Sequence, residues 1–168
     1  MKKDKEVFNW EVAGFFWIII VGSLLHFTYE WSGQNPIVGT VSAVNESVWE
    51  HLKLGYWSLF FFMLIENRYL KGRVKSFFLA KLSGIIAMEL FIIIFFYTYT
   101  AILGDTILWL DIGSYIVGAF LCQLISFVLI NRKVSGIINN LSLALFIVLG
   151  VLFVVFTFYP PDLPIFKE

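Results

Sequence analysis

The sequence is poor in charge and in cysteine, and each shortage excludes a class of protein. Only 14% of its 168 residues are charged, whereas 60% are hydrophobic and 19% are aromatic. A water-soluble domain has about 25% charged residues with which to cover its surface, so we expect lipid to cover this one. The formal net charge is zero, which argues against nucleic acid as a partner. The single cysteine, Cys122, cannot form an intramolecular disulfide or a thiolate metal cluster.

The long apolar runs predict instead an all-α, polytopic membrane helix bundle. The mean hydropathy of the chain is +0.85. Five segments are long and apolar enough to cross a hydrocarbon core of about 30 Å. They cover residues 12–31, 46–65, 77–98, 109–130 and 139–158. Because the connections are short and no internal repeat is visible, we expect residues 1–168 to form a single transmembrane domain.

Lysine and arginine predict the orientation of these five transmembrane helices, because both residues concentrate in cytoplasmic loops. They precede the first span and occupy the second-to-third and fourth-to-fifth connections: Lys2, Lys3, Lys5, Arg68, Lys71, Arg73, Lys75, Arg132 and Lys133. Segments 32–44 and 101–108 on the other side contain neither residue, and the tail contains only Lys167. We therefore expect the N-terminus inside and the C-terminus outside.

Ionisable residues near the outer ends of the first two spans are the candidates for chemistry, because such groups are costly in lipid and usually face a cavity or a partner. The two histidines of the chain fall at similar depths on these two helices. Glu30 lies one turn after His26 on the first, and Glu46 and Glu50 lie one turn apart on the second. Imidazole and carboxylate together suit a divalent ion, and zinc fits this donor set best. The expected metal ligands are His26, Glu30, Glu46 and His51, with Asp105 and Asp111 as candidate additions.

Three further residues are candidates for catalysis. Glu50 lies beside the expected ligands and Ser47 lies one turn before His51, so they could act as an acid–base group and a nucleophile. Glu89, near the middle of the third span, could relay protons. If Glu89 is charged it needs a partner, for which Lys53 is the candidate.

Structural roles also explain these residues. Segment 47–50 matches the capping box S-x-x-E. The segment lies at the N-terminal, positive end of the dipole of the second helix, and His26 lies near the C-terminal, negative end of the dipole of the first helix. Glu89 could form an interhelical hydrogen bond. Glu11 and Lys81 lie near the inner boundary, where we expect them to snorkel toward the headgroups.

Three segments resemble a family of small integral-membrane proteins from Gram-positive bacteria that has no assigned function. Segments 26–33, 43–53 and 159–166 read HFTYEWSG, AVNESVWEHLK and YPPDLPIF. The resemblance extends along nearly the whole chain. It implies a multi-pass protein of the bacterial plasma membrane, and it assigns no catalytic residue.

A shorter segment is similar to a motif of the adiponectin-receptor-like membrane proteins. Residues 45–55 resemble N-E-[ST]-x-x-I-W-x-H-L-L-G with two residues removed. Those proteins belong to a superfamily of zinc-containing membrane hydrolases, so the similarity implies a zinc site. They have seven spans and a late H-x-x-x-H pair, whereas this sequence has no histidine after His51, so carboxylates would have to replace those ligands.

Together these features favour a metal-dependent membrane hydrolase that acts on a lipid or another amphiphile. Its site would open outward between the first two helices. One alternative is a small ion- or proton-coupled transporter or ion-binding protein, in which Glu89 continues the path. Another is a structural or immunity-type partner protein, in which the polar residues only lock two helices together. Membrane lipid is an expected partner in each case, and an oligomer is compatible with the sequence.

Overall fold

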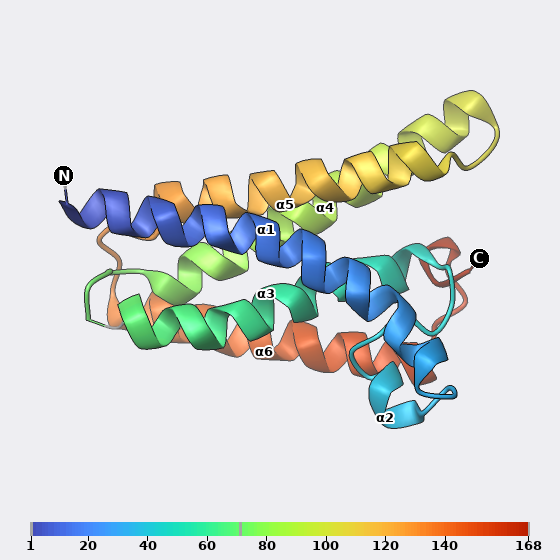
Figure 1. Cartoon of the computed structure of the whole chain (residues 1–168), viewed down its shortest axis with the longest axis horizontal. Helices are drawn as coiled ribbons and strands as arrows, with labels where there is room; N and C mark the ends of the chain where they lie inside the picture. The colour runs from blue at the N-terminus through green and yellow to red at the C-terminus, as the bar shows by residue number, and fades with distance from the viewer. Residues whose placement is uncertain (1, 71, 168) are drawn as a thin grey trace.

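The computed structural model describes residues 2–70 and 72–167, and within these ranges it contains helices and no strands. The elements in chain order are α1 (Lys2–Trp31), α2 (Pro36–Gly39), α3 (Val48–Leu70), α4 (Phe77–Leu103), α5 (Leu108–Leu129), α6 (Gly136–Phe158) and the 3₁₀ turn η1 (Pro164–Phe166). The all-α prediction is confirmed. The five long helices form an elongated bundle (Figure 1).

The two ends of the bundle carry different segments. We call one the loop end: it contains the α1–α3 connection with α2, the α4–α5 turn and the C-terminal segment (Figure 1). The opposite end, which we call the N-terminal end, contains the start of α1 and the α3–α4 and α5–α6 connections.

Four of the described helices, α1, α4, α5 and α6, are long and apolar enough to cross a membrane. This composition supports the prediction of a membrane protein. Helix α3 is the exception, because its 23 residues include Glu50, Lys53, Glu66 and Arg68. The segment predicted as the second span therefore lacks a stretch as apolar as those found in the other four long helices.

Helix α3 lies at the centre of the bundle, which explains how it tolerates this polarity. It contacts α1, α4 and α6, and 13 of its 23 residues are buried. The exposed faces of α4, α5 and α6 are rich in large aliphatic and aromatic side chains. The outer helices thus present apolar surface and enclose much of the polar surface of α3.

The prediction that Glu11 and Lys81 extend toward the headgroups is wrong. Neither snorkels: the Lys81 side chain is completely buried, and that of Glu11 is 4% exposed. Lys81 Nζ lies 3.0 and 3.1 Å from the two carboxylate oxygens of Glu11 on α1. It also lies 2.7 Å from Glu66 Oε2 on α3. Two carboxylates inside the bundle therefore provide Lys81 with the polar partners that we expected from the headgroup region.

Candidate metal centre

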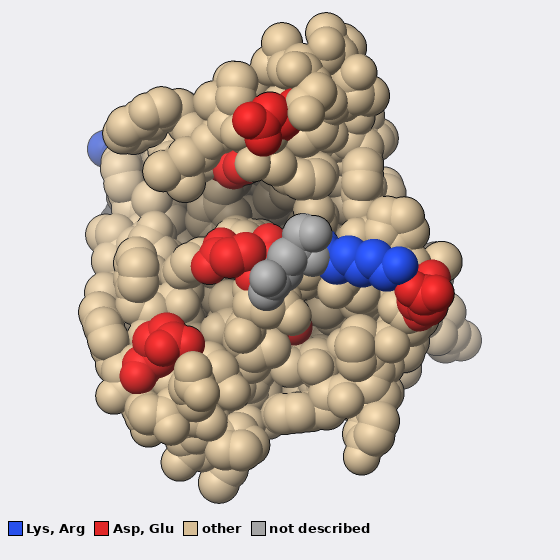
Figure 2. Space-filling model, turned by 90° about the vertical axis from the view of Figure 1, so that its right-hand side faces the viewer, with Lys and Arg blue, Asp and Glu red and all other residues tan. Residues whose placement is uncertain are grey.

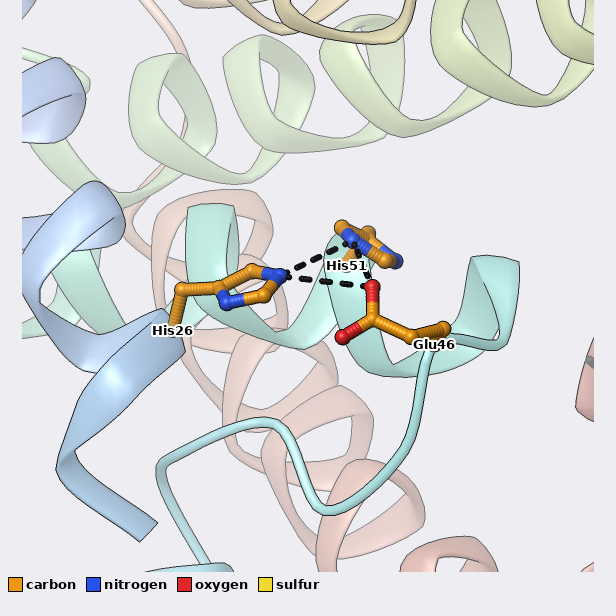
Figure 3. A group of neighbouring side chains, drawn as sticks. All are labelled: His26, Glu46 and His51. Atoms are coloured by element: carbon orange, nitrogen blue, oxygen red, sulfur yellow. Dashed lines mark hydrogen bonds and ion pairs between the residues drawn. The ribbon is translucent and has the colours of Figure 1, made fainter. Parts of the chain in front are cut away.

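His26, Glu46 and His51 converge on one point at the loop end of the bundle (Figure 3). His26 comes from the last third of α1, Glu46 from the loop before α3, and His51 from the first turn of α3. The two Nε2 atoms lie 3.3 Å apart, and each lies 3.5 Å from Glu46 Oε2. Three donor atoms from three separate segments therefore form a nearly equilateral triangle.

The size of this triangle fits a zinc ion. Zinc binds histidine nitrogen and carboxylate oxygen at about 2.0–2.2 Å, so the ligand atoms of a tetrahedral site lie about 3.3–3.5 Å apart. The distances between the three donor atoms are 3.3, 3.5 and 3.5 Å. Two imidazoles and one carboxylate could hold three positions around such an ion, which would leave a fourth for water or substrate.

The backbone orients His51 for this role. Its Nδ1 lies 2.9 Å from the carbonyl oxygen of Ser47, one turn earlier. A carbonyl oxygen can only accept, so Nδ1 must carry the proton, and Nε2 then presents its lone pair to the triangle. A hydrogen bond of this kind, from the second ring nitrogen to a carbonyl, is typical of metal-binding histidines. Ser47 thus contributes its carbonyl to the geometry around His51.

The loop that carries Glu46 is held against α1 by hydrogen bonds. The hydroxyl of Ser42 accepts from the backbone N–H of Tyr29 at 2.9 Å and donates to the carbonyl of Leu25. Helix α1 ends just before Gly33 and Gln34, whose φ angles of 68° and 61° turn the chain sharply back. The returning chain passes beside the last turns of α1, and so brings Glu46 near His26.

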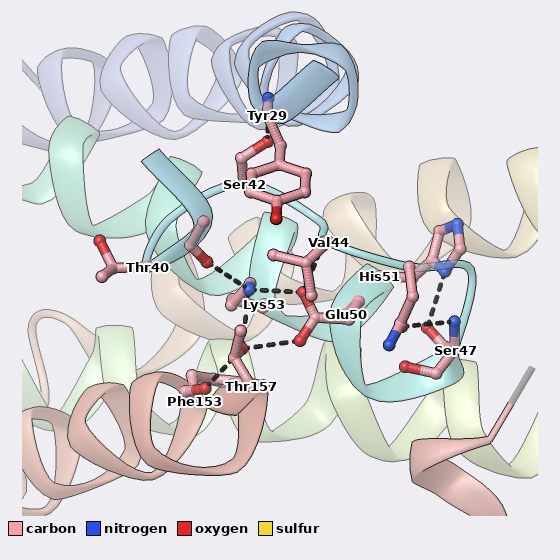
Figure 4. A network of polar contacts seen from close by, with 12 residues as sticks. Tyr29, Thr40, Ser42, Val44, Ser47, Glu50, His51, Lys53, Phe153 and Thr157 are labelled. Carbon is pink, nitrogen blue, oxygen red and sulfur yellow. Dashed lines mark hydrogen bonds and ion pairs between the residues drawn. The ribbon is translucent and has the colours of Figure 1, made fainter. Parts of the chain in front are cut away.

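A second polar network holds the same loop from the other side (Figure 4). Lys53 Nζ, which is completely buried, donates to the carbonyl of Gly39 at 2.9 Å and to Thr157 Oγ1 at 2.8 Å, and lies 2.5 Å from Glu50 Oε2. Glu50 accepts from the backbone N–H of Val44 at 2.9 Å and from the Thr157 hydroxyl at 2.7 Å. This network joins the loop, α3 and α6.

Glu50 therefore does not join the histidines, although it is adjacent to His51 in sequence. Successive residues on a helix point about 100° apart. His51 faces His26, while Glu50 faces α6. Lys53, expected as a partner for Glu89, pairs with Glu50 instead. The carboxylate of Glu50 accepts from Val44, so it does not close a capping box on the Ser47 N–H, which bonds to Asn45.

Glu30 lies beside the triangle. It lines a cavity of about 260 Å³ together with His26, Phe27, Ala43, Val44, Asn45 and Glu46. Its Oε1 atom accepts a hydrogen bond of 3.3 Å from Gln34 Nε2. The cavity is thus lined by two of the three donor residues, His26 and Glu46, and by apolar side chains. Glu30 provides a second carboxylate in this cavity.

The remaining candidates lie elsewhere. Glu89 is buried in α4, and its Oε1 atom has no hydrogen-bond partner among the described residues. Asp111 accepts from the Tyr99 hydroxyl at 2.5 Å, and Asp105 accepts from the backbone of Thr106 at 2.8 Å. Asp105 lies in the α4–α5 turn and Asp111 in the first turn of α5, and the α4–α5 turn lies apart from α2 and its loop (Figure 1).

Most of the surface at the loop end is uncharged, but most of the charged groups visible there are acidic, and the surface is hollowed between some of them (Figure 2). Connections 32–47 and 104–107 contain Glu46 and Asp105 but no lysine or arginine. In segment 159–167 the single base, Lys167, lies 2.6 Å from Asp162. A negative surface of this kind attracts cations and raises their local concentration.

A family described as "Family of unknown function (DUF6512)" matches residues 1–168, the whole chain. The chain belongs to this family. The membership agrees with the resemblance to an uncharacterised family of membrane proteins that the sequence motifs indicate. No curated protein and no solved structure matches the chain.

Two groups in the polar interior were missed by sequence reasoning. Thr157, which bridges Glu50 and Lys53, lies at the end of an apolar span and has no charge to draw attention to it. Glu66 lies one residue beyond the predicted end of the second span, 46–65, and so fell outside the search for ionisable residues within the spans. A helical-face analysis could have found Glu66, because it lies on one face with Phe62 and Leu59, which are buried.

Proposed function

We propose that His26, Glu46 and His51 bind a zinc ion and that the protein is a metal-dependent membrane hydrolase. The observation that carries this proposal is the triangle of Nε2, Nε2 and Oε2 atoms, whose sides of 3.3–3.5 Å match those of a tetrahedral zinc site. Capping or packing alone would not require two imidazole nitrogens and a carboxylate oxygen to face one another. The similarity of segment 45–55 to zinc-containing membrane hydrolases points the same way.

The chemistry of such a site is hydrolysis. A zinc ion with three protein ligands supplies Lewis acidity and activates water at its open position. Glu30 lines the adjoining cavity, and its carboxylate would serve there as the proton acceptor. Phe27, Ala43 and Val44 give the same cavity an apolar wall. A lipid or another amphiphile with a hydrolysable bond near its polar head fits these surroundings.

We further propose that all five long helices cross the plasma membrane of a bacterium, with the loop end outside. The buried pairing of Glu50 with Lys53 and of Glu66 with Lys81 supports α3 as a fifth span, because neither pair is left facing lipid. The basic residues of the N-terminal end support the orientation, because the connections at the loop end lack them.

Cysteine labelling tests this topology. In a Cys122→Ala background, an impermeant thiol reagent applied to intact cells should label Thr106→Cys and spare Lys133→Cys. Both positions are exposed, so cell lysis should make both reactive and serves as the control. Labelling of position 133 in intact cells would overturn the orientation and place the candidate metal centre on the cytoplasmic side.

Metal analysis of protein purified without chelator tests the function. We expect one zinc ion per chain that survives gel filtration, and hydrolysis of an ester-linked amphiphile that chelation abolishes and added zinc restores. An ion that is bound but exchanges freely would favour the second candidate function, an ion-binding or transport protein. Glu89 supports that candidate, because its Oε1 atom is buried without a partner among the described residues. Protein without stoichiometric metal would leave the polar residues as a structural clasp and end the hydrolase proposal.

A further inference from the structure

A cluster of three charged side chains lies inside the bundle toward its N-terminal end, and none of the roles above uses it. Glu11 from α1, Glu66 from α3 and Lys81 from α4 meet there. The side chains of Lys81 and Glu66 are completely buried, and that of Glu11 is 4% exposed. The cluster thus draws its members from three helices and has almost no contact with solvent.

The charges of this cluster do not balance. Two carboxylates face one ammonium group, so the fully ionised cluster has a formal charge of −1. Helix α5 adds the hydroxyl of Ser126, the thiol of Cys122 and the uncharged amide of Gln123 near this depth, and α6 contains no ionisable residue. The network at the other end differs, because there one glutamate, Glu50, faces one lysine, Lys53.

An uncompensated charge in the interior of a membrane protein is expensive, and buried ions persist only when they are paired. The surplus charge of this cluster therefore calls for one bound cation. A proton is the smallest cation and needs no coordination shell. The alternative, a sodium ion, needs several oxygen ligands around one point.

The hydrogen bonds distinguish the two carboxylates. Both oxygens of Glu11 accept from Lys81 Nζ, and Oε1 also accepts from Ser126 Oγ at 2.7 Å. Three donated hydrogen bonds favour the ionised form of Glu11. Glu66 has one close ionic contact, between Oε2 and Lys81 Nζ, and neither of its carboxylate oxygens has a hydrogen bond of good geometry among the residues described.

A further buried polar group adjoins the cluster. Gln123 lies one turn from Ser126 on α5, is 4% exposed, and neither atom of its amide has a hydrogen-bond partner in the described part of the chain. A Cβ atom at Gly14, one turn from Glu11 on α1, would lie 2.5 Å from Gln123 Nε2. The amide therefore lies about one helical turn from the cluster, on the side toward the loop end, where its oxygen or a bridging water can take part in proton exchange.

We propose that Glu11, Lys81 and Glu66 form a proton-binding site and that Glu66 carries its exchangeable proton. The ligand of this second site is a proton, whereas that of the histidine site is a divalent metal. The two sites lie toward opposite ends of the bundle and share no residue, so this inference does not depend on the hydrolase proposal.

Infrared spectroscopy of the full-length purified protein tests the proposal through the carboxylic acid C=O stretch. The measurement is made at neutral pH in a Glu89→Gln background. Glu89 is also deeply buried and, unlike Glu66, has no ion pair with a base in the described part of the chain, so it could give a carboxylic acid signal of its own. We expect a signal equal to one carboxylic acid per chain that shifts in D₂O. The signal should vanish when Glu66→Gln is introduced into this background. It should persist when the control substitution Glu50→Gln is introduced instead, because Glu50 belongs to the balanced pair with Lys53.

Three results would overturn the proposal. The first is the absence of a carboxylic acid band from the Glu89→Gln protein, which needs no variant of the cluster itself. The second is a band that survives Glu66→Gln in a folded variant. The third is a band that appears only when sodium is replaced by choline, because a sodium ion would then hold the place assigned to the proton.

Discussion

Lys53→Met is expected to lower the free energy of unfolding by about 3–5 kcal/mol, the usual cost of leaving a buried charge without its partner. Lys53 is completely buried and Glu50 is 2% exposed, so water cannot replace the lost ammonium group at the carboxylate. The carbonyl of Gly39 and the hydroxyl of Thr157 lose a donor as well. The measurement is thermal or denaturant unfolding of the purified protein in detergent.

Two controls separate the buried charge from a general effect of losing a lysine or arginine. Arg73→Met removes an ion pair with Glu6 whose side chains are 59% and 40% exposed, and it should cost less than about 1 kcal/mol. The double variant Lys53→Met with Glu50→Leu removes both buried charges and should regain much of the lost stability. If Lys53→Met cost no more than Arg73→Met, the network in Figure 4 would not hold the loop to α3 and α6.

His26→Ala and His51→Ala should each reduce bound zinc from one ion per chain to a small fraction of that amount. Each replacement leaves only two of the three donors in the triangle, and its open edge admits water. The double variant should lose little more than either single variant, because residues that act as a unit are strongly non-additive. Elemental analysis after gel filtration measures the bound metal directly.

Glu30→Gln is the matched control for these histidine variants. Glu30 lines the same cavity but does not belong to the group of three donors, so this variant should keep its zinc while losing hydrolytic activity. The histidine variants would contradict the metal proposal if both retained one zinc ion per chain. They would also contradict it if each changed only the melting temperature and the two effects were additive.

Much of the helical architecture was accessible from hydropathy. The predicted spans 77–98, 109–130 and 139–158 lie close to α4, α5 and α6, because these helices are apolar on almost every face. The prediction for α1 began at residue 12, whereas the helix begins at Lys2. Hydropathy finds the part of a helix that suits lipid, and the polar first turns of α1 lie outside that part.

The candidate site was predictable only in part, because depth along a helix does not determine the direction of a side chain. His26 and His51 were placed at one depth, and the structure brings them together. Glu50 was placed at the same depth, yet it points to α6. The choice of Glu46 as the third donor depends on how the loop folds back, which rests on the hydroxyl of Ser42 and the short helix α2.

The polar contacts between helices were not predictable, because they depend on which faces of different helices meet. Lys81 finds Glu11 and Glu66 on two other helices, and Thr157 lies more than 100 residues beyond Glu50. A single sequence gives neither the rotation of a helix nor the neighbour it faces. Because these partners could not be known from the sequence, the prediction that Lys81 extends toward the headgroups rested only on its distance to the membrane boundary.

The central position of α3 has a consequence for how the protein is made. A translocon releases a segment into lipid according to its hydropathy, and α3 emerges from the ribosome with four charged residues and before α4 and α6. Lys53 neutralises Glu50 within α3, but Lys81, the base that faces Glu66, lies on the following helix, and the Thr157 hydroxyl that bonds Glu50 lies near the end of the chain. Helix α3 would therefore be retained near α1 during synthesis and enter its final environment only when the last helix has been added.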